Sequence, residues 1–377
     1  MAQATEPVPV SPEERPAEGG RIVALDAARA AAIVGMIAVN VGPREDGGGL
    51  LAVLYGLPVG RASLLFMMLA GIGMSILSRR ARRPGGRLPW TSVLWRAGLL
   101  FVSGLALQLL DHEVSVILAT YGMLFLLCLP LLRARARVLA WTAGVVTVAG
   151  PLLWVGAQVA AGDTYRFIQP TLLDPPADVL RGTFLSGSYP VVVWAAPFLV
   201  GLLLGRADLR SRALHKRLVL WGAVAAVAGY VVSRLLILAF GEPPNRMGWD
   251  HLVSAVDHSQ MPLWLVSGLG SAAFVLGIFM LAERFVARRL GALIAAGRLS
   301  LTIYVVHLGV LAALVRPEPH TLYDGILITT VLSVGSIVFA VLWLKWFKTG
   351  PLEYLLRTPD LPRWRRRNAR APGASGE

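Results

Sequence analysis

Long apolar stretches separated by short polar links recur along the whole chain. A transmembrane helix needs about 20 mostly apolar residues, because it rises 1.5 Å per residue through about 30 Å of hydrocarbon. The chain offers ten stretches of roughly that length. We therefore predict an all-α fold, a polytopic integral membrane bundle of about ten transmembrane helices. The predicted spans are 22–42, 61–78, 91–110, 114–132, 138–160, 189–205, 218–240, 263–282, 298–315 and 324–344.

Basic residues are distributed unevenly between the links. The second, fourth, sixth and eighth links and the C-terminal segment are rich in arginine, as at Arg79, Arg80, Arg82 and Arg83, whereas the intervening links hold few basic residues. Lys and Arg beside transmembrane helices stay in the cytoplasm. The alternation therefore predicts that both termini are cytoplasmic, which an even number of spans satisfies.

The composition agrees with a membrane protein. Hydrophobic residues make up 55% of the chain and charged residues 15%, and the mean hydropathy is +0.63, whereas a soluble domain carries about 25% charge. The net charge of +14 is also typical of nucleic-acid binders, but the basic residues form separate clusters at the predicted helix ends. We expect membrane lipids with anionic head groups as partners, and no nucleic acid. The predicted location is the cell membrane, with several passes.

Both ends of the chain differ from its centre. Residues 1–20, rich in Pro, Glu and Ala, and the basic segment 359–377 are predicted to be disordered cytoplasmic tails, which leaves 21–358 as the transmembrane domain. The single cysteine, Cys128, excludes an intramolecular disulfide. The sequence contains no Walker-type glycine loop, CxxC pair or HExxH helix. We therefore predict neither phosphate-hydrolysing transport nor a metal cofactor.

Polar residues inside the first span are informative, because charge in hydrocarbon is costly and usually faces a cavity or a partner. Asp26 and Arg29 are three positions apart and share a helix face. A self-neutralising ion pair near the head groups and a ligand-binding pair both fit this spacing. Asn40 lies nearly four turns after Asp26, on almost the same stripe but at the opposite mouth. One polar stripe is thus predicted to reach both sides of the membrane.

Later spans carry further polar residues. Arg96 lies near the start of the third span, and Tyr121 lies in the middle of the fourth, where its hydroxyl needs a hydrogen-bond partner unless interhelical packing alone explains the residue. The ninth span begins at Arg298 and places Tyr304 and His307 on one helix face. For the mid-span imidazole, hydrogen bonding inside the bundle and direct chemistry both remain open.

The predicted outer loops contain histidines beside acids. His251 and His258 each follow an aspartate, seven residues apart, and on a helix they would be separated by about 10 Å, too far for one metal ion. A histidine there can accept a proton from a hydroxyl or amine, because its pKa is near neutrality. His112, in a short charged turn, is another candidate base, although a solvated surface turn explains it equally simply.

Several short motifs together resemble a known family. They are Leu25-Asp26-Ala-Ala-Arg29 with Gly35-Met36 and Val39-Asn40, Trp95-Arg96, Ile117-Leu118 with Tyr121-Gly122, Trp194 with Pro197 and Gly205-Arg206, His258-Ser259, Gly297-Arg298 through Tyr304 and His307, and Gly350-Pro351-Leu-Glu353-Tyr354 with Arg357. In this order, from about residue 21 to 358, they resemble the YeiB-like branch of the heparan-alpha-glucosaminide N-acetyltransferase family. The resemblance implies transfer of an acetyl group from cytoplasmic acetyl-CoA to an acceptor across the membrane.

The resemblance also implies roles for single residues. Asn40 matches the asparagine near the transfer site, and Tyr304 and His307 match a tyrosine and a histidine of a late helix. The family places a catalytic histidine eleven residues after the asparagine, where this chain has Leu51. Another histidine must then supply the base, His258 first and His112 or His307 behind it, or the chemistry differs.

The sequence thus predicts a membrane-embedded acyltransferase that uses acyl-CoA, with acetyl-CoA as the simplest case, as donor and a glycan or small amine or hydroxyl compound as extracytoplasmic acceptor. The predicted catalytic residues are Asn40, His258 and His307, and the predicted substrate-binding residues are Asp26, Arg29, Arg96, Tyr121, Arg298 and Tyr304. A small-solute transporter using the same polar stripe and a catalytically silent membrane scaffold are the alternatives, and a homo-oligomer fits any of the three.

Overall fold

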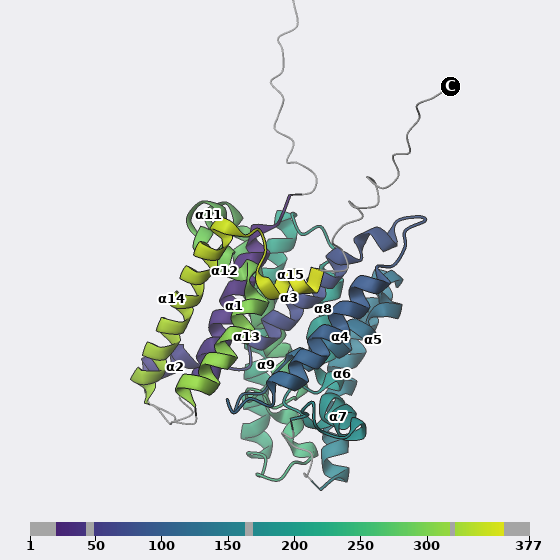
Figure 1. The fold of residues 1–377 in the computed structure, drawn as a ribbon. Helices are drawn as coiled ribbons and strands as arrows, with labels where there is room; N and C mark the ends of the chain where they lie inside the picture. Colours follow the sequence, from purple (N-terminus) through teal and green to yellow (C-terminus); the bar gives the residue numbers. More distant parts are fainter. Residues whose placement is uncertain (1–19, 43–48, 163–168, 317–320, 358–377) are drawn as a thin grey trace, which may run out of the picture.

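In the computed structural model, residues 20–42, 49–162, 169–316 and 321–357 are described, and every regular element in them is helical (Figure 1). The predicted tails lie outside the described residues, apart from Gly20. The long helices are α1 (Val23–Val41), α3 (Ala62–Leu77), α4 (Trp90–Leu107), α5 (Leu118–Leu127), α6 (Ala136–Ala160), α8 (Val191–Leu204), α9 (Arg212–Phe240), α10 (Pro262–Leu281), α13 (Ser300–Val310) and α14 (Leu322–Trp346). The all-α prediction is confirmed.

Short elements connect and flank these helices. The short α-helices are α2 (Leu50–Gly56), α7 (Pro176–Arg181), α11 (Glu283–Arg289), α12 (Gly291–Arg298) and α15 (Pro351–Arg357). The 3-10 turns are η1 (Arg79–Arg82), η2 (Leu129–Arg133) and η4 (Trp249–Val253), and the π-helical turns are η3 (Gly182–Ser186) and η5 (Leu311–Val315).

Within the described part of the chain, six helices are long and apolar enough to cross a membrane: α1, α4, α6, α9, α10 and α14. Two bent pairs raise the number to eight if each is one span. They are α7 and η3 with α8, bent by 61°, and α12 with α13 and η5, bent by 78°. The protein is therefore a multi-pass membrane protein. Each of the ten predicted ranges contains a helix, but ten spans and the cytoplasmic side of the termini stay predictions.

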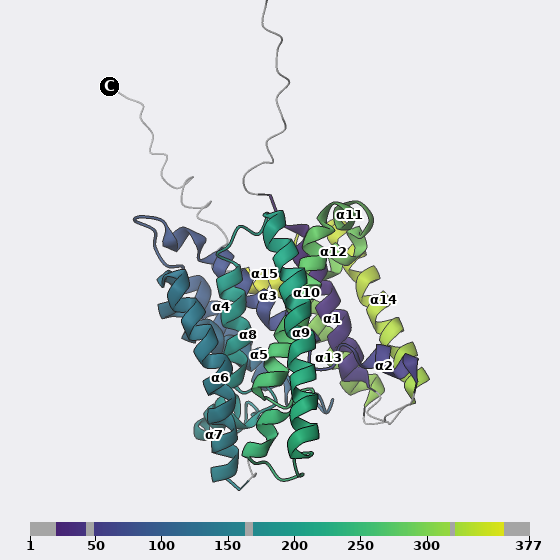
Figure 2. The same cartoon turned by 180° about the vertical axis from the view of Figure 1, so that it is seen from behind.

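The bundle has a buried centre and an apolar outer layer. Helices α1 and α3 are largely buried, whereas α9 and α14 are mostly exposed on the outside, as the two opposite views show (Figures 1 and 2). A Cβ added to Gly71 would lie 2.1 Å from the carbonyl oxygen of Phe198, and one added to Gly201 would lie 2.0 Å from that of Met68. Helices α3 and α8 thus pack backbone to backbone, as small residues permit in membranes.

Arginines of the basic links bond to the carbonyls that end helices. Arg82 Nη2 donates to the carbonyl oxygen of Ser75 at 2.9 Å, and Arg206 Nη2 donates to that of Leu131 at 2.8 Å. A cation there satisfies carbonyls that lack helical partners and complements the helix dipole. These arginines therefore stabilise helix ends, at the end of the bundle where α1 begins and α15 lies (Figure 1).

Candidate functional site

Asn40 of α1 and His307 of α13 meet inside the bundle. Asn40 Nδ2 lies 2.9 Å from His307 Nε2, and His307 Nδ1 lies 3.3 Å from the carbonyl oxygen of Ile303, one turn earlier. A carbonyl only accepts hydrogen bonds, so the imidazole is best described as neutral, with Nδ1 donating to Ile303 and Nε2 accepting from the Asn40 amide. The contact joins an amide donor to a proton acceptor in one buried place.

Arg316 holds the end of α1 beside this pair. Its Nη2 donates to the carbonyl oxygens of Asn40 at 2.6 Å and Val41 at 3.3 Å. The π-helical turn η5 leads from α13 directly to this arginine, and such turns are frequent at functional sites. Sequence reasoning assigned Arg316 no role, because only the fold brings the end of η5 next to the end of α1.

Two tyrosines line the interior next to His307. The Tyr304 hydroxyl accepts a hydrogen bond from the Ile117 amide at 3.2 Å, and its ring centroid lies 5.2 Å from that of His307. The ring of Phe66 lies near both Tyr304 and Tyr121, at 6.5 and 5.6 Å between centroids. The buried Tyr121 hydroxyl has no hydrogen-bond partner among the described residues. The described residues thus supply no hydrogen-bond partner for Tyr121, whose ring packs against Phe66.

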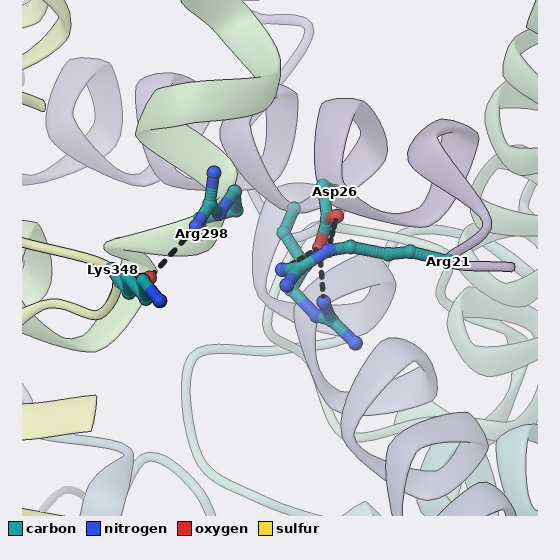
Figure 3. Close-up of polar contacts among 5 residues, drawn as sticks. Arg21, Asp26, Arg298 and Lys348 are labelled. Carbon is teal, nitrogen blue, oxygen red and sulfur yellow. Dashed lines mark hydrogen bonds and ion pairs between the residues drawn. The ribbon is translucent and has the colours of Figure 1, made fainter. Parts of the chain in front are cut away.

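Asp26 forms the centre of an ionic cluster in the first turn of α1. It is buried and accepts hydrogen bonds from Arg29 Nη1 at 2.8 Å and Arg21 Nη2 at 3.0 Å, with a second, shorter contact from Arg21 Nε (Figure 3). The predicted Asp26–Arg29 pair therefore exists, and Arg21 extends it. One carboxylate between two guanidinium groups leaves a net positive charge at this end of the bundle.

Arg96 and Arg298 bond to main-chain carbonyls near the C-terminal elements. Arg298 Nη2 donates to the carbonyl oxygen of Lys348 at 2.7 Å (Figure 3), and Arg96 Nε donates to that of Leu356 at 3.2 Å. Arg298 also lies within electrostatic range of Arg21 and Asp26. Arg298 thus belongs to one positive region with the Asp26 cluster, while Arg96 lies beside α15.

His258 occupies a separate aromatic enclosure. Its ring centroid lies 5.9 Å from Tyr189, 6.1 Å from Trp194 and 5.8 Å from Trp264, and its buried Nδ1 has no hydrogen-bond partner within the described ranges. The residue has a φ of 57°, a conformation uncommon outside glycine and found where surrounding structure fixes it. No hydrogen bond or ring contact between described residues joins His258 to Asn40.

Two family models match the chain, and together they cover the residues that form this site. A family model described as "Heparan-alpha-glucosaminide N-acetyltransferase, catalytic" matches residues 21–234, which is more than half of the chain. The chain belongs to this family. A second model, described as "Protein of unknown function (DUF418)", matches residues 204–359. No curated protein matches the chain. The resemblance carried by the short motifs is thus confirmed, and it makes the protein a member of a membrane acetyltransferase-type family.

Position 51 distinguishes this member of the acetyltransferase family. Leu51 stands where the resemblance implies a catalytic histidine, and its side chain is 45% exposed on α2. A leucine side chain has no titratable group and cannot act as a general base. Among the histidines proposed as base, His307 is the one that is hydrogen-bonded to Asn40 in the described part of the chain.

The other candidate groups have different surroundings. His112 is buried with both ring nitrogens engaged, Nε2 with the Leu107 carbonyl oxygen at 3.0 Å and Nδ1 with the Val114 amide at 3.0 Å. It therefore holds its turn together. No group of three or more His, Cys, Asp or Glu side chains that could hold a metal ion occurs in the described part of the chain.

Two small cavities lie beside this interior. One, of about 10 Å³, has a polar lining that includes Gln108 and Thr183, and the other, of about 30 Å³, is mostly aliphatic. None of the predicted site residues lines either cavity. The polar stripe from Asp26 to Asn40 that reaches both sides of the membrane stays a prediction.

We expect His258 to make the folded protein sensitive to acid. Burial lowers the pKa of His258 from 6.5 to about 4. Between about pH 6.5 and pH 4, this histidine is therefore protonated in the unfolded chain and neutral in the folded chain. Its contribution to stability is complete above about pH 6.5 and is lost as the pH falls toward 4, by about 3 kcal/mol. Thermal unfolding in detergent at neutral and acidic pH measures this loss.

The matched variants for that measurement are His258→Gln and His251→Gln. His258→Gln should reduce the acid-induced loss of stability, whereas His251→Gln, in the same segment between α9 and α10, should retain it. An acid-induced loss in His258→Gln as large as in the parent protein would contradict the assignment to His258.

Proposed function

We propose that the protein is an acyltransferase that moves an acyl group, acetyl in the simplest case, from cytoplasmic acyl-CoA to an amine or hydroxyl acceptor on the far side of the membrane. The Asn40–His307 hydrogen bond supports this function most directly, because it places a carboxamide donor against an unprotonated imidazole nitrogen. Those two groups are what acyl transfer needs, one for the developing oxyanion and one for the acceptor's proton.

The proposed reaction is a direct displacement at the thioester. The acceptor nitrogen or oxygen attacks the carbonyl carbon, and the Asn40 amide donates a hydrogen bond to the oxygen that becomes negative. His307 Nε2 takes the proton released by the acceptor, while its Nδ1 stays hydrogen-bonded to Ile303. The C–S bond breaks, and the proton passes to the departing sulfur to give free coenzyme A. His258, in its own enclosure, is assigned to the acceptor side.

The donor's phosphates are assigned to the positive region around Asp26. Arg29 and Arg298 carry charge there, and Arg96 adds charge beside α15. Guanidinium groups bind phosphates through paired hydrogen bonds. The apolar interior beyond these arginines suits an uncharged pantetheine arm and excludes water from the thioester.

The test uses the purified full chain in detergent with acetyl-CoA and an amine such as glucosamine. Calorimetry should detect acetyl-CoA binding, and a thiol reagent should detect coenzyme A released only when the amine is present. Dephospho-CoA is the matched control for the phosphate contacts and should bind more weakly. Absence of both binding and thiol release would overturn the proposed function.

A small-solute carrier is the second candidate. The bent pairs at α8 and at α12 with α13 favour it, because helices broken within the membrane often surround a transport site. Solute uptake into vesicles that contain no coenzyme A would support a carrier. Thiol release without uptake would support the transferase, and neither activity would leave the membrane scaffold.

A further inference from the structure

A mostly aliphatic pocket lies between α4, α5, α13 and α15. It has a volume of about 30 Å³, and its lining includes Leu100, Leu118, Leu301, Val305 and Leu355. Leu301, Val305 and Leu355 remain partly or largely exposed, so the pocket borders the outside of the bundle. An unfilled aliphatic space of this kind loses dispersion contacts, and hydrocarbon is the filling that restores them.

Helix α15 is fastened across this pocket on both sides. Glu353 Oε1 accepts the amide of Leu301 at 2.7 Å, and Oε2 accepts the hydroxyl of Thr302 at 2.6 Å, which ties α15 to the first turn of α13. On the other side, Trp95 Nε1 of α4 donates to the carbonyl oxygen of Leu355 at 2.8 Å. Helix α15 is therefore the roof of the pocket: polar contacts fix its position, and Leu352 and Leu355 line the space beneath it. Figure 1 shows α15 lying across this side of the bundle.

The charge beside the roof is positive. Arg96 lies next to the last turn of α15, Arg357 ends α15 and is exposed, and Arg298 lies within electrostatic range of Arg357. The nearby carboxylate of Glu353 is already occupied by α13, and that of Asp26 is buried between two arginines. An apolar slot with a basic rim is complementary to an amphiphile that has a hydrocarbon chain and an anionic head.

We propose that this pocket takes part of one acyl chain of a phospholipid with a net negative head group, whose phosphate lies at Arg357. The phospholipid of the surrounding bilayer is favoured over the acyl chain of acyl-CoA, because Leu301, Val305 and Leu355 of the lining are exposed in part at the outside of the bundle, whereas neither Asn40 nor His307 lines the pocket. The inference does not depend on the proposed acyl transfer.

The experiment measures lipid retention by native mass spectrometry of the full chain in detergent, with added phosphatidylglycerol or with phosphatidylcholine of the same chains. Retention of one phosphatidylglycerol, with an affinity about 10-fold above that for phosphatidylcholine, is expected, which corresponds to about 1.4 kcal/mol. Val305→Phe, which fills the slot, should weaken retention by about 10-fold or more. Val306→Phe is the matched control, because Val306 is exposed on the same helix and does not line the pocket.

Charge is tested separately by Arg357→Gln, with Arg284→Gln as a matched exposed control on α11. Arg357→Gln should reduce the preference for phosphatidylglycerol while the melting temperature is unchanged, so the test holds even if Val305→Phe fails to fold. The proposal is overturned if Val305→Phe and Arg357→Gln retain lipid like the parent protein, or if their controls lose it equally. Displacement of the bound lipid by equimolar palmitoyl-CoA would also overturn it, in favour of the acyl donor.

Discussion

Replacing Asn40 with alanine is expected to lower the rate of acyl transfer by about 100- to 1000-fold, equivalent to about 2.7–4 kcal/mol of transition-state stabilisation. The amide is the donor assigned to the oxyanion, and its nitrogen lies 2.9 Å from the nitrogen assigned as base. The measurement is coenzyme A release in the presence of an amine. Asn245→Ala, at an exposed amide, is the control and should keep full activity.

A double-mutant cycle tests whether Asn40 and His307 act as one unit. His307→Ala should reduce the rate to a similar extent, and the double variant should lose little more than the worse single variant, because groups that work together are strongly non-additive. Losses that simply multiply would argue for two independent contributions. Full acyl transfer in a correctly folded Asn40→Ala protein would exclude the role given to this residue.

The second large effect concerns folding. A Cβ added to Gly297 would lie 1.7 Å from the carbonyl oxygen of Asp26, a main-chain atom that no side-chain rotation can move. Gly297→Ala must therefore push α12 away from α1, and overpacking of this kind costs about 1–3 kcal/mol and occasionally more. We expect the upper end of that range. The melting temperature and the yield of monodisperse protein in detergent measure it.

Gly98→Ala in α4 is the matched substitution. A Cβ added there meets nothing within 4 Å, and alanine is favoured over glycine in a helix interior by about 1 kcal/mol. The melting temperature of Gly98→Ala should equal or exceed that of the parent protein. If Gly297→Ala melts no lower than Gly98→Ala, the close approach of α12 to α1 does not exist in solution.

Most of the helical fold follows from the chain itself. The long apolar stretches place the helices, because each has to bury or satisfy its own backbone hydrogen bonds in hydrocarbon. The bend between α12 and α13 at Leu299 and the π-helical turn η5 were not predicted. Helix α12 packs against α1 and α14. The periodicity of apolar residues along the sequence does not show which helices pack together, so it does not predict such breaks.

The candidate site was only partly predictable. Asn40, His307 and Tyr304 stood out as polar groups in apolar spans, but their pairing joins residues 267 positions apart. Arg316 looked like one arginine of an outer link, and the aromatic rings around His258 come from two segments, Tyr189 with Trp194 at the start of α8 and Trp264 in α10. Local patterns identify the residue types, whereas tertiary packing decides which of them meet.

The Arg316 contact has a mechanical consequence. It ties the last turn of α1 to the segment that continues from α13, and the Asn40–His307 bond joins the same two helices a short way inside. Because of these two crosslinks, relative movement of α1 and α13 would have to break both hydrogen bonds, so the amide and the imidazole are expected to keep their alignment. A passage for a reactant is then expected to open through other helices of the bundle, without separating the two reacting groups.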